Sequence, residues 1–186
     1  MRFPFNLIAK TIGNQFSNLL SLSKHGAAEA LLKRGNALRT LKHYDEALAS
    51  YDKALAVQPG FAEALSKRGH TLQDLRRYDE ALASYDKALA IQPGHAAALS
   101  ARGSALQELK RYDEALASCE QALAIQPDFI YALSNRGNAL QALRRYDKAL
   151  ASYNKALVLN PDFAEALMNC GNVQNCPIVN VIDALQ

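Results

Sequence analysis

Several residue types are scarce in this chain, and each shortage excludes a class of protein. Of 186 residues, none is tryptophan, three are cysteine and only 8% are aromatic, whereas alanine and leucine supply most of the 49% that are hydrophobic. An all-β fold is therefore not expected, because strands favour aromatic and β-branched residues. The chain is also too long and too apolar to be a disulfide-stapled miniprotein or a disordered tail.

Long hydrophobic runs are missing as well. No stretch reaches the roughly 18 apolar residues of a membrane span, and Asn6 and Lys10 interrupt the segment where a secretory signal would need its apolar region. The cysteines have neither CxxC spacing nor a nearby histidine pair, so we expect no bound metal and a reducing, cytoplasmic setting. They are Cys119, Cys170 and Cys176.

The chain has only a small excess of positive charge. The formal net charge is +3, and the three bases of residues 1–28, a segment without acids, account for all of it. The remainder is balanced, whereas a surface that binds nucleic acid needs a basic excess to neutralise phosphates. We therefore expect no nucleic-acid partner.

The sequence is dominated by a repeat with a period of 34 residues. Glycine, proline, tyrosine and leucine recur in step, as do runs of Ala-Leu-Ala-Ser. The glycines are Gly35, Gly69, Gly103, Gly137 and Gly171, and the prolines are Pro59, Pro93, Pro127 and Pro161. The pattern defines an array over residues 28–176, with units at 28–61, 62–95, 96–129 and 130–163 and a partial unit at 164–176.

The spacing inside a unit predicts two antiparallel helices. In the first unit, Leu31, Gly35 and Leu38 share one face of a first helix that Tyr44 ends, and Asp45 opens a second helix that Pro59 ends. We expect the residue after each proline to cap the next helix, and Gly35 to face Ala47 and Ala54 so that the helices approach closely. Such pairs must stack to bury their apolar surface, which predicts an all-α solenoid.

These repeated residues resemble the tetratricopeptide repeat (TPR), over about 150 of the 186 residues. The resemblance implies a right-handed α-solenoid of antiparallel helix pairs. It also implies a concave groove, lined by the first helices, that binds peptides or partner proteins. As a functional signal it is weak, because the matching residues are those that pack.

We expect the first-helix residues that do not belong to the repeated packing positions to face the groove. Examples are Glu29, Leu32 and Lys33 in the first unit and Ser66 in the second. The N-terminal half carries donors that suit acidic peptides, and the C-terminal half carries neutral amides. The candidates are Lys33, Asn36, Arg39, Lys67, His70, Gln73, Asn135, Asn138 and Gln141. The alternative is an ordinary solvated helix face. The carboxylate clamp of related chaperone-binding repeats is not reproduced, because Ala97 and Ala101 replace its two bases.

Two other residue sets favour structure over chemistry. An arginine precedes each of the first four repeat glycines. We expect these arginines to pair with repeated aspartates, as an alternative to forming an anion-binding ladder. The arginines are Arg34, Arg68, Arg102 and Arg136, and the aspartates are Asp45, Asp79, Asp113 and Asp147. Cys119 replaces a repeated tyrosine and is expected to be inert packing. The four histidines occupy different registers, and no catalytic motif occurs, so we expect no enzyme and no cofactor.

Both ends depart from the pattern. Residues 1–27 predict an amphipathic helix that stops at Ser23–Gly26 and caps the first unit; the alternative is a helix lying on an anionic membrane. At the other end, the fifth unit loses its second helix, and residues 177–186 form an irregular or short helical tail. The apolar face left at Leu167 and Val173 is covered either by this tail or by a second copy in a homodimer.

The leading hypothesis is a non-enzymatic scaffold that binds extended peptide segments in its groove. The alternatives are a detached substrate-recognition array of an O-linked N-acetylglucosamine transferase and a structural protein that self-assembles.

Overall fold

The computed structural model describes the backbone of residues 5–173 and the side chains of residues 23–171 and 173. Within this range the chain forms nine helices and no strand. They are α1 (Phe5–Thr40), α2 (Tyr44–Val57), α3 (Ala62–Asp74), α4 (Tyr78–Ile91), α5 (Ala96–Glu108), α6 (Tyr112–Ile125), α7 (Ile130–Ala142), α8 (Tyr146–Leu159) and α9 (Ala164–Asn172). The predicted all-α fold is confirmed.

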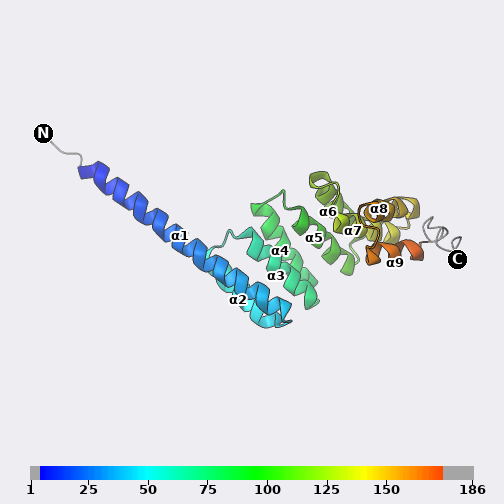
Figure 1. Ribbon diagram of the computed structural model, residues 1–186, viewed down its shortest axis with the longest axis horizontal. Helices are drawn as coiled ribbons and strands as arrows, with labels where there is room; N and C mark the ends of the chain where they lie inside the picture. Colours follow the sequence, from blue (N-terminus) through cyan, green and yellow to red (C-terminus); the bar gives the residue numbers. More distant parts are fainter. Residues whose placement is uncertain (1–4, 174–186) are drawn as a thin grey trace.

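The helices form pairs that follow one another along the molecule (Figure 1). Each first helix packs against the second helix that follows it, and each second helix packs against the first helix of the next unit. From α3 on, first helices begin at Ala62, Ala96, Ile130 and Ala164, the first residues of the units read from the sequence. The array is therefore an α-solenoid of antiparallel helix pairs.

The helix α1 corrects one expectation. It runs without a break from Phe5 to Thr40, so the turn predicted at Ser23–Gly26 is wrong. Gly26 does not take a positive φ angle, and a single glycine costs a helix only about 1 kcal/mol, which is too little to end it between strong helix formers. The N-terminal half of α1 projects beyond the other helices (Figure 1). Its capping role stays a prediction.

The connections between helices correct two local details. The repeated tyrosines begin the second helices at Tyr44, Tyr78, Tyr112 and Tyr146; they do not end the first helices. The turn before them needs one left-handed residue, which is Lys42 in the first unit, with a φ angle of 62°. The first helices are capped one residue later than predicted, at Phe61, His95, Phe129 and Phe163. The second helices end before the prolines, as predicted.

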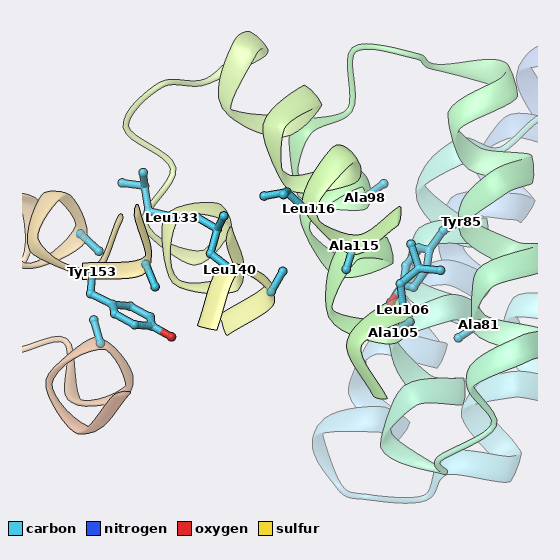
Figure 2. Close-up of a cluster of buried hydrophobic side chains, with 14 of the residues drawn as sticks. Ala81, Tyr85, Ala98, Ala105, Leu106, Ala115, Leu116, Leu133, Leu140 and Tyr153 are labelled. Atoms are coloured by element: carbon cyan, nitrogen blue, oxygen red, sulfur yellow. The ribbon is translucent and has the colours of Figure 1, made fainter. Parts of the chain in front are cut away.

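The core lies between the two helices of each unit and between neighbouring units. Its largest fully buried side chains include Tyr51, Tyr85 and Tyr153, with Cys119 in the same register. Figure 2 shows Tyr85 beside Leu106, and Tyr153 on the far side of Leu133 and Leu140. The repeat glycines face these side chains: a Cβ atom added to Gly69 would lie 2.6 Å from Cε1 of Tyr85, and one added to Gly103 would lie 3.3 Å from the carbonyl oxygen of Ala115, the counterpart of Ala47. The missing side chain therefore makes room for the tyrosine ring.

At the C-terminal end, the apolar residues of the partial fifth unit differ in exposure. Val173 is only 2% exposed and Leu167 is half-buried, whereas Met168 is 68% exposed. Val173 therefore lies on a covered surface, as the sequence predicts, and what covers it stays a prediction. Residues 174–186, which include the predicted tail, lie outside the described residues.

In the described range, no helix has the length and apolar character needed to cross a membrane. Cys119 carries a free, buried thiol, whereas Cys170 is disulfide-bonded. The cytoplasmic location stays a prediction.

Candidate peptide-binding groove

The candidate groove lies on the side of the solenoid where the first helices meet. Each of α1, α3, α5 and α7 contacts the next first helix as well as its own partner, so this side is the more tightly curved one. All nine candidate residues lie on these helices. The geometry therefore brings them to one surface, in two groups along its length.

One register assigned to the groove does not belong to it. Leu32 is buried in the core of the first unit, and its counterparts Ser66, Ser100 and Ser134 are buried as well. A side chain at this helical position points between neighbouring first helices, so a ligand in the groove cannot reach it. In the second to fourth units the position is occupied by serine. The remaining candidates are exposed or half-buried.

The N-terminal half of the groove contains three cationic side chains. Arg39 Nε donates to Asp74 Oδ2 at 2.8 Å and so joins α1 to α3. Lys33 is exposed and Lys67 is half-buried, and neither has a hydrogen bond or an ion pair within the described part of the chain. The two lysines are therefore the charged donors that a ligand can reach without breaking an existing bond.

His70 is not the cationic donor that the sequence suggested. Its Nδ1 donates to the backbone carbonyl of Ser66 at 2.8 Å, and its ring meets Tyr85 edge-on. Burial lowers the pKa of His70, and the positive charges of Arg39 and Lys67 lower it further. With Nδ1 as the donor, Nε2 of the neutral ring is an acceptor, so His70 cannot donate to a carboxylate unless it gains a proton.

The groove amides of the N-terminal half are held by tyrosines from the second helices. Tyr51 donates to Asn36 Oδ1 at 2.9 Å, and Tyr85 donates to Gln73 Oε1. Burial raises the pKa of both phenols, so they remain neutral donors. The amide groups are thus oriented with their NH₂ groups left to meet a ligand.

The C-terminal amides form a denser network. Asn135 Nδ2 donates to Ser100 Oγ at 3.1 Å, across to the previous unit. Tyr153 donates to both Asn138 Oδ1 at 2.7 Å and Gln141 Oε1 at 2.9 Å. This half of the groove is therefore largely occupied by its own hydrogen bonds, unlike the half that contains the lysines.

Two groove features were not among the candidates. Glu165 Oε1 accepts from Ser134 at 3.1 Å and from Asn138 at 3.3 Å, which places a carboxylate at the C-terminal end. Tyr131 is 60% exposed and lies edge-on between Phe129 and Phe163. The sequence does show that Tyr131 is an aromatic residue at the position that Glu29 has in the first unit. It does not show the contacts of Tyr131 with Phe129 and Phe163, because these two residues cap the helices α7 and α9.

Two of the four repeated arginines join neighbouring units, by a different contact from the one predicted. Arg68 pairs with Asp52 at 2.8 Å and Arg102 pairs with Asp86 at 2.7 Å, in place of Asp79 and Asp113. Each acid comes from the second helix of the preceding unit. The structural role holds, and it links units to each other.

The environment of Cys119 does not activate its thiol. Burial raises the pKa of the Cys119 thiol to about 12, so the nucleophilic thiolate is suppressed. No group of three or more histidine, cysteine, aspartate or glutamate side chains is placed to hold a metal ion in the part of the chain that the structure describes.

Known proteins with this architecture include a domain whose structure contains a bound peptide. MamA is similar at 25% identity and a TM-score of 0.70, covering 79% of this chain and 80% of its own. The first TPR of Spaghetti (RPAP3), bound to the HSP90 peptide SRMEEVD, is similar at 29% identity and a TM-score of 0.59, covering 60% and 89%. PilF of Pseudomonas aeruginosa, at 24% identity and a TM-score of 0.75, covering 81% and 69%, shows the fold alone.

A comparison with curated proteins gives no significant match. Two family models described as tetratricopeptide repeat match the chain, one over residues 28–61 and 130–163 and the other over residues 60–128. Together they span residues 28–163, and the helix pairs occupy the same units. The chain therefore belongs to the tetratricopeptide repeat family.

Proposed function

We propose that this protein is a scaffold that binds an extended, acidic peptide segment of a partner protein in the N-terminal half of its groove. The observation that carries the proposal is the contrast between the two halves. The Lys33 and Lys67 side chains have no partner in the described part of the chain, whereas the C-terminal amides bond to Ser100, Tyr153 and Glu165.

The RPAP3 domain supports the choice of an acidic ligand, because the peptide bound to it, SRMEEVD, has three carboxylate side chains. A ligand carboxylate that reaches Lys33 or Lys67 would gain a charge-assisted hydrogen bond. The same carboxylate would favour protonated His70, which would then offer a further donor at Nε2.

The test uses a fluorescent SRMEEVD peptide as a probe, with the Asn/Gln version SRMQQVN as a match that lacks the three side-chain carboxylates. The double variant Lys33→Ala, Lys67→Ala should weaken SRMEEVD binding by about 1.5 to 3 kcal/mol for each charge-assisted hydrogen bond that it removes. The control variant Lys53→Ala, Lys87→Ala removes the same charge from exposed positions on α2 and α4 and should leave binding within twofold. Equal weakening by both variants, or equal binding of both peptides, would reject the groove assignment.

The alternatives have less support. None of the proteins reported above links this chain to a glycosyltransferase, so no observation favours a detached recognition array of an enzyme. The homodimer through the C-terminal end likewise stays a prediction.

A further inference from the structure

A second charged surface lies outside the groove, between the second helices α6 and α8. It is a hollow of about 210 Å³ with Leu116 and Leu140 in its wall, both of which belong to the buried cluster of Figure 2. Its charged lining consists of Arg136, Arg145 and Lys148 with a single acid, Glu120. This lining combines an apolar base with an excess of positive charge.

The repeat itself shows how unusual this hollow is. At the same positions of the third unit, Arg111 makes a bidentate contact with Glu114 at 2.7 Å, and Arg102 pairs with Asp86 at 2.7 Å. Every charge there has an opposite partner. The second unit is alike, with Arg77 bonded to Glu80 at 2.6 Å.

Both of these ion pairs are lost in the fourth unit. Lys148 stands where Glu46, Glu80 and Glu114 stand in the other units, so Arg145 meets a like charge in place of an acid. The nearest carboxylate to Arg145 is that of Asp113, at 3.9 Å, which is 80% exposed.

The arginine of the first helix keeps the serine contact that Arg68 and Arg102 also make, with Ser84 and Ser118, but loses its acid. Arg136 Nε donates to Ser152 Oγ at 3.0 Å, and within the described residues it forms no ion pair with Glu120, the counterpart of Asp86. Three cations thus converge on one small hollow without the pairs that neutralise them elsewhere. A basic cluster held around a concave site is the arrangement that binds a phosphate group, whose several oxygens accept from more than one cation.

We propose that this hollow binds the phosphate of a phosphorylated serine or threonine side chain in a partner protein. Its volume suits one anionic group, not an extended chain, and the balanced charge of the array disfavours a nucleic-acid backbone. The proposal is independent of the peptide groove, because the hollow is lined by α6, α7 and α8 on the side of the second helices.

The test measures binding of N-acetyl-O-phosphoserine amide to the full chain by amide NMR shifts at constant ionic strength. Saturable shifts should centre on α6 and α8, with N-acetylserine amide giving none and N-acetylglutamate amide binding at least tenfold more weakly. Lys148→Glu restores the residue of the other units and should weaken phosphoserine binding at least tenfold, and Lys148→Gln should weaken it less.

Lys53→Glu is the matched control, since it makes the same charge change at an exposed position of α2, outside both the hollow and the groove, and should alter the affinity less than twofold. Equal weakening in the Lys148→Glu and Lys53→Glu variants would show a non-specific charge effect and overturn the proposal. Equal binding of the glutamate probe, or shifts centred outside α6 and α8, would overturn it as well.

Discussion

At the scale of single residues, the repeat glycines set how closely the helices of a unit can approach. A Cβ atom added to Gly103 would lie 2.6 Å from Cys119 Sγ and 3.3 Å from the carbonyl oxygen of Ala115. Gly94, in the preceding connection, has nothing within 4 Å of such an atom. Glycine is therefore required at the first site by packing, and is not required for this reason at the second.

Gly103→Ala should consequently lower the free energy of unfolding by about 1 to 3 kcal/mol, because the added methyl group must displace a buried thiol. Gly103→Leu should open the hairpin further. Gly94→Ala should stay within about 0.5 kcal/mol of the wild type. Chemical denaturation measures all three.

A double-mutant cycle identifies the contact. In a Cys119→Ala background the sulfur is gone, so Gly103→Ala should cost much less than in the wild type. An undiminished cost in that background would show that the sulfur is not what the glycine accommodates.

His70 makes the stability of the N-terminal half depend on pH. Burial lowers its pKa in the folded chain below the usual 6.5, Arg39 and Lys67 act in the same direction, and the Ser66 carbonyl and Asp74 oppose them. The unfolded chain therefore binds the proton more readily. The stabilisation from neutral His70 is present above about pH 6.5 and is lost as the pH falls from there towards the lowered folded pKa.

Unfolding free energies measured between pH 7.5 and 5 should thus decrease for the wild type more steeply than for His70→Gln. NMR titration of the His70 ring gives the pKa directly. A ring that titrates above 6.5, or identical pH slopes in the two proteins, would contradict the assignment. Adding the SRMEEVD peptide should raise this pKa if the groove binds it near His70.

The groove shows where residue-level prediction from sequence stops. The register places Asn36 and Asn138 on the first helices correctly, because helical periodicity fixes a face. It does not show that a tyrosine fifteen residues later holds each amide, or that Lys67 is left without a partner among the described residues. Such pairing depends on side-chain distances between helices, which periodicity does not supply.

At the scale of elements, the repeat predicts helix pairs well and their ends poorly. The prolines and the apolar spacing locate the second helices, since proline cannot continue the hydrogen-bonded ladder. The start of a helix depends on one residue's dihedral angles, which is why Phe61 and not Gly60 is the cap. The same limit explains α1, where Gly26 resembles a turn residue but has helical neighbours on both sides.

The continuity of α1 can be tested at Gly26. This residue has no positive φ angle and nothing within 4 Å of an added Cβ atom, so alanine fits there without strain. Gly26→Ala should raise the free energy of unfolding by up to about 1 kcal/mol and increase helical circular dichroism. Gly26→Pro should reduce both. A turn at Ser23–Gly26 predicts the reverse for alanine if it uses a left-handed glycine.

At the scale of the whole molecule, the array is not uniform in charge. Residues 29–186 have equal numbers of acidic and basic residues, but the fourth unit differs from the others. It has Lys148 where the first three units have glutamate, and Asn154 where the first unit has Asp52. The glycine, proline and tyrosine residues of the fourth unit match the repeat, so the packing pattern does not reveal this exchange of charge. The candidates for a function specific to one unit are therefore the residues that differ from their counterparts in the other units.

The stacked architecture also determines how damage spreads. Among the described helices, the contacts between units join units that are neighbours in sequence, so the stability of the array is approximately a sum of unit and interface contributions. Leu106 lies on α5, is fully buried, and shares its cluster with Tyr85 on α4 and Ala115 on α6. It is therefore a residue whose removal affects one interface first.

Leu106→Ala should lower the free energy of unfolding locally by about 2 to 5 kcal/mol, because it removes buried apolar area and leaves a cavity. Hydrogen exchange resolved by residue should show the largest decrease in protection in α5 and α6, a smaller decrease in α4 and α7, and the least in α2 and α9. Met168→Ala, at an exposed position of α9, should leave the profile unchanged. An equal decrease in protection from α2 to α9 would mean that the helix pairs unfold as one cooperative body, and that interactions between neighbouring units alone do not describe the array.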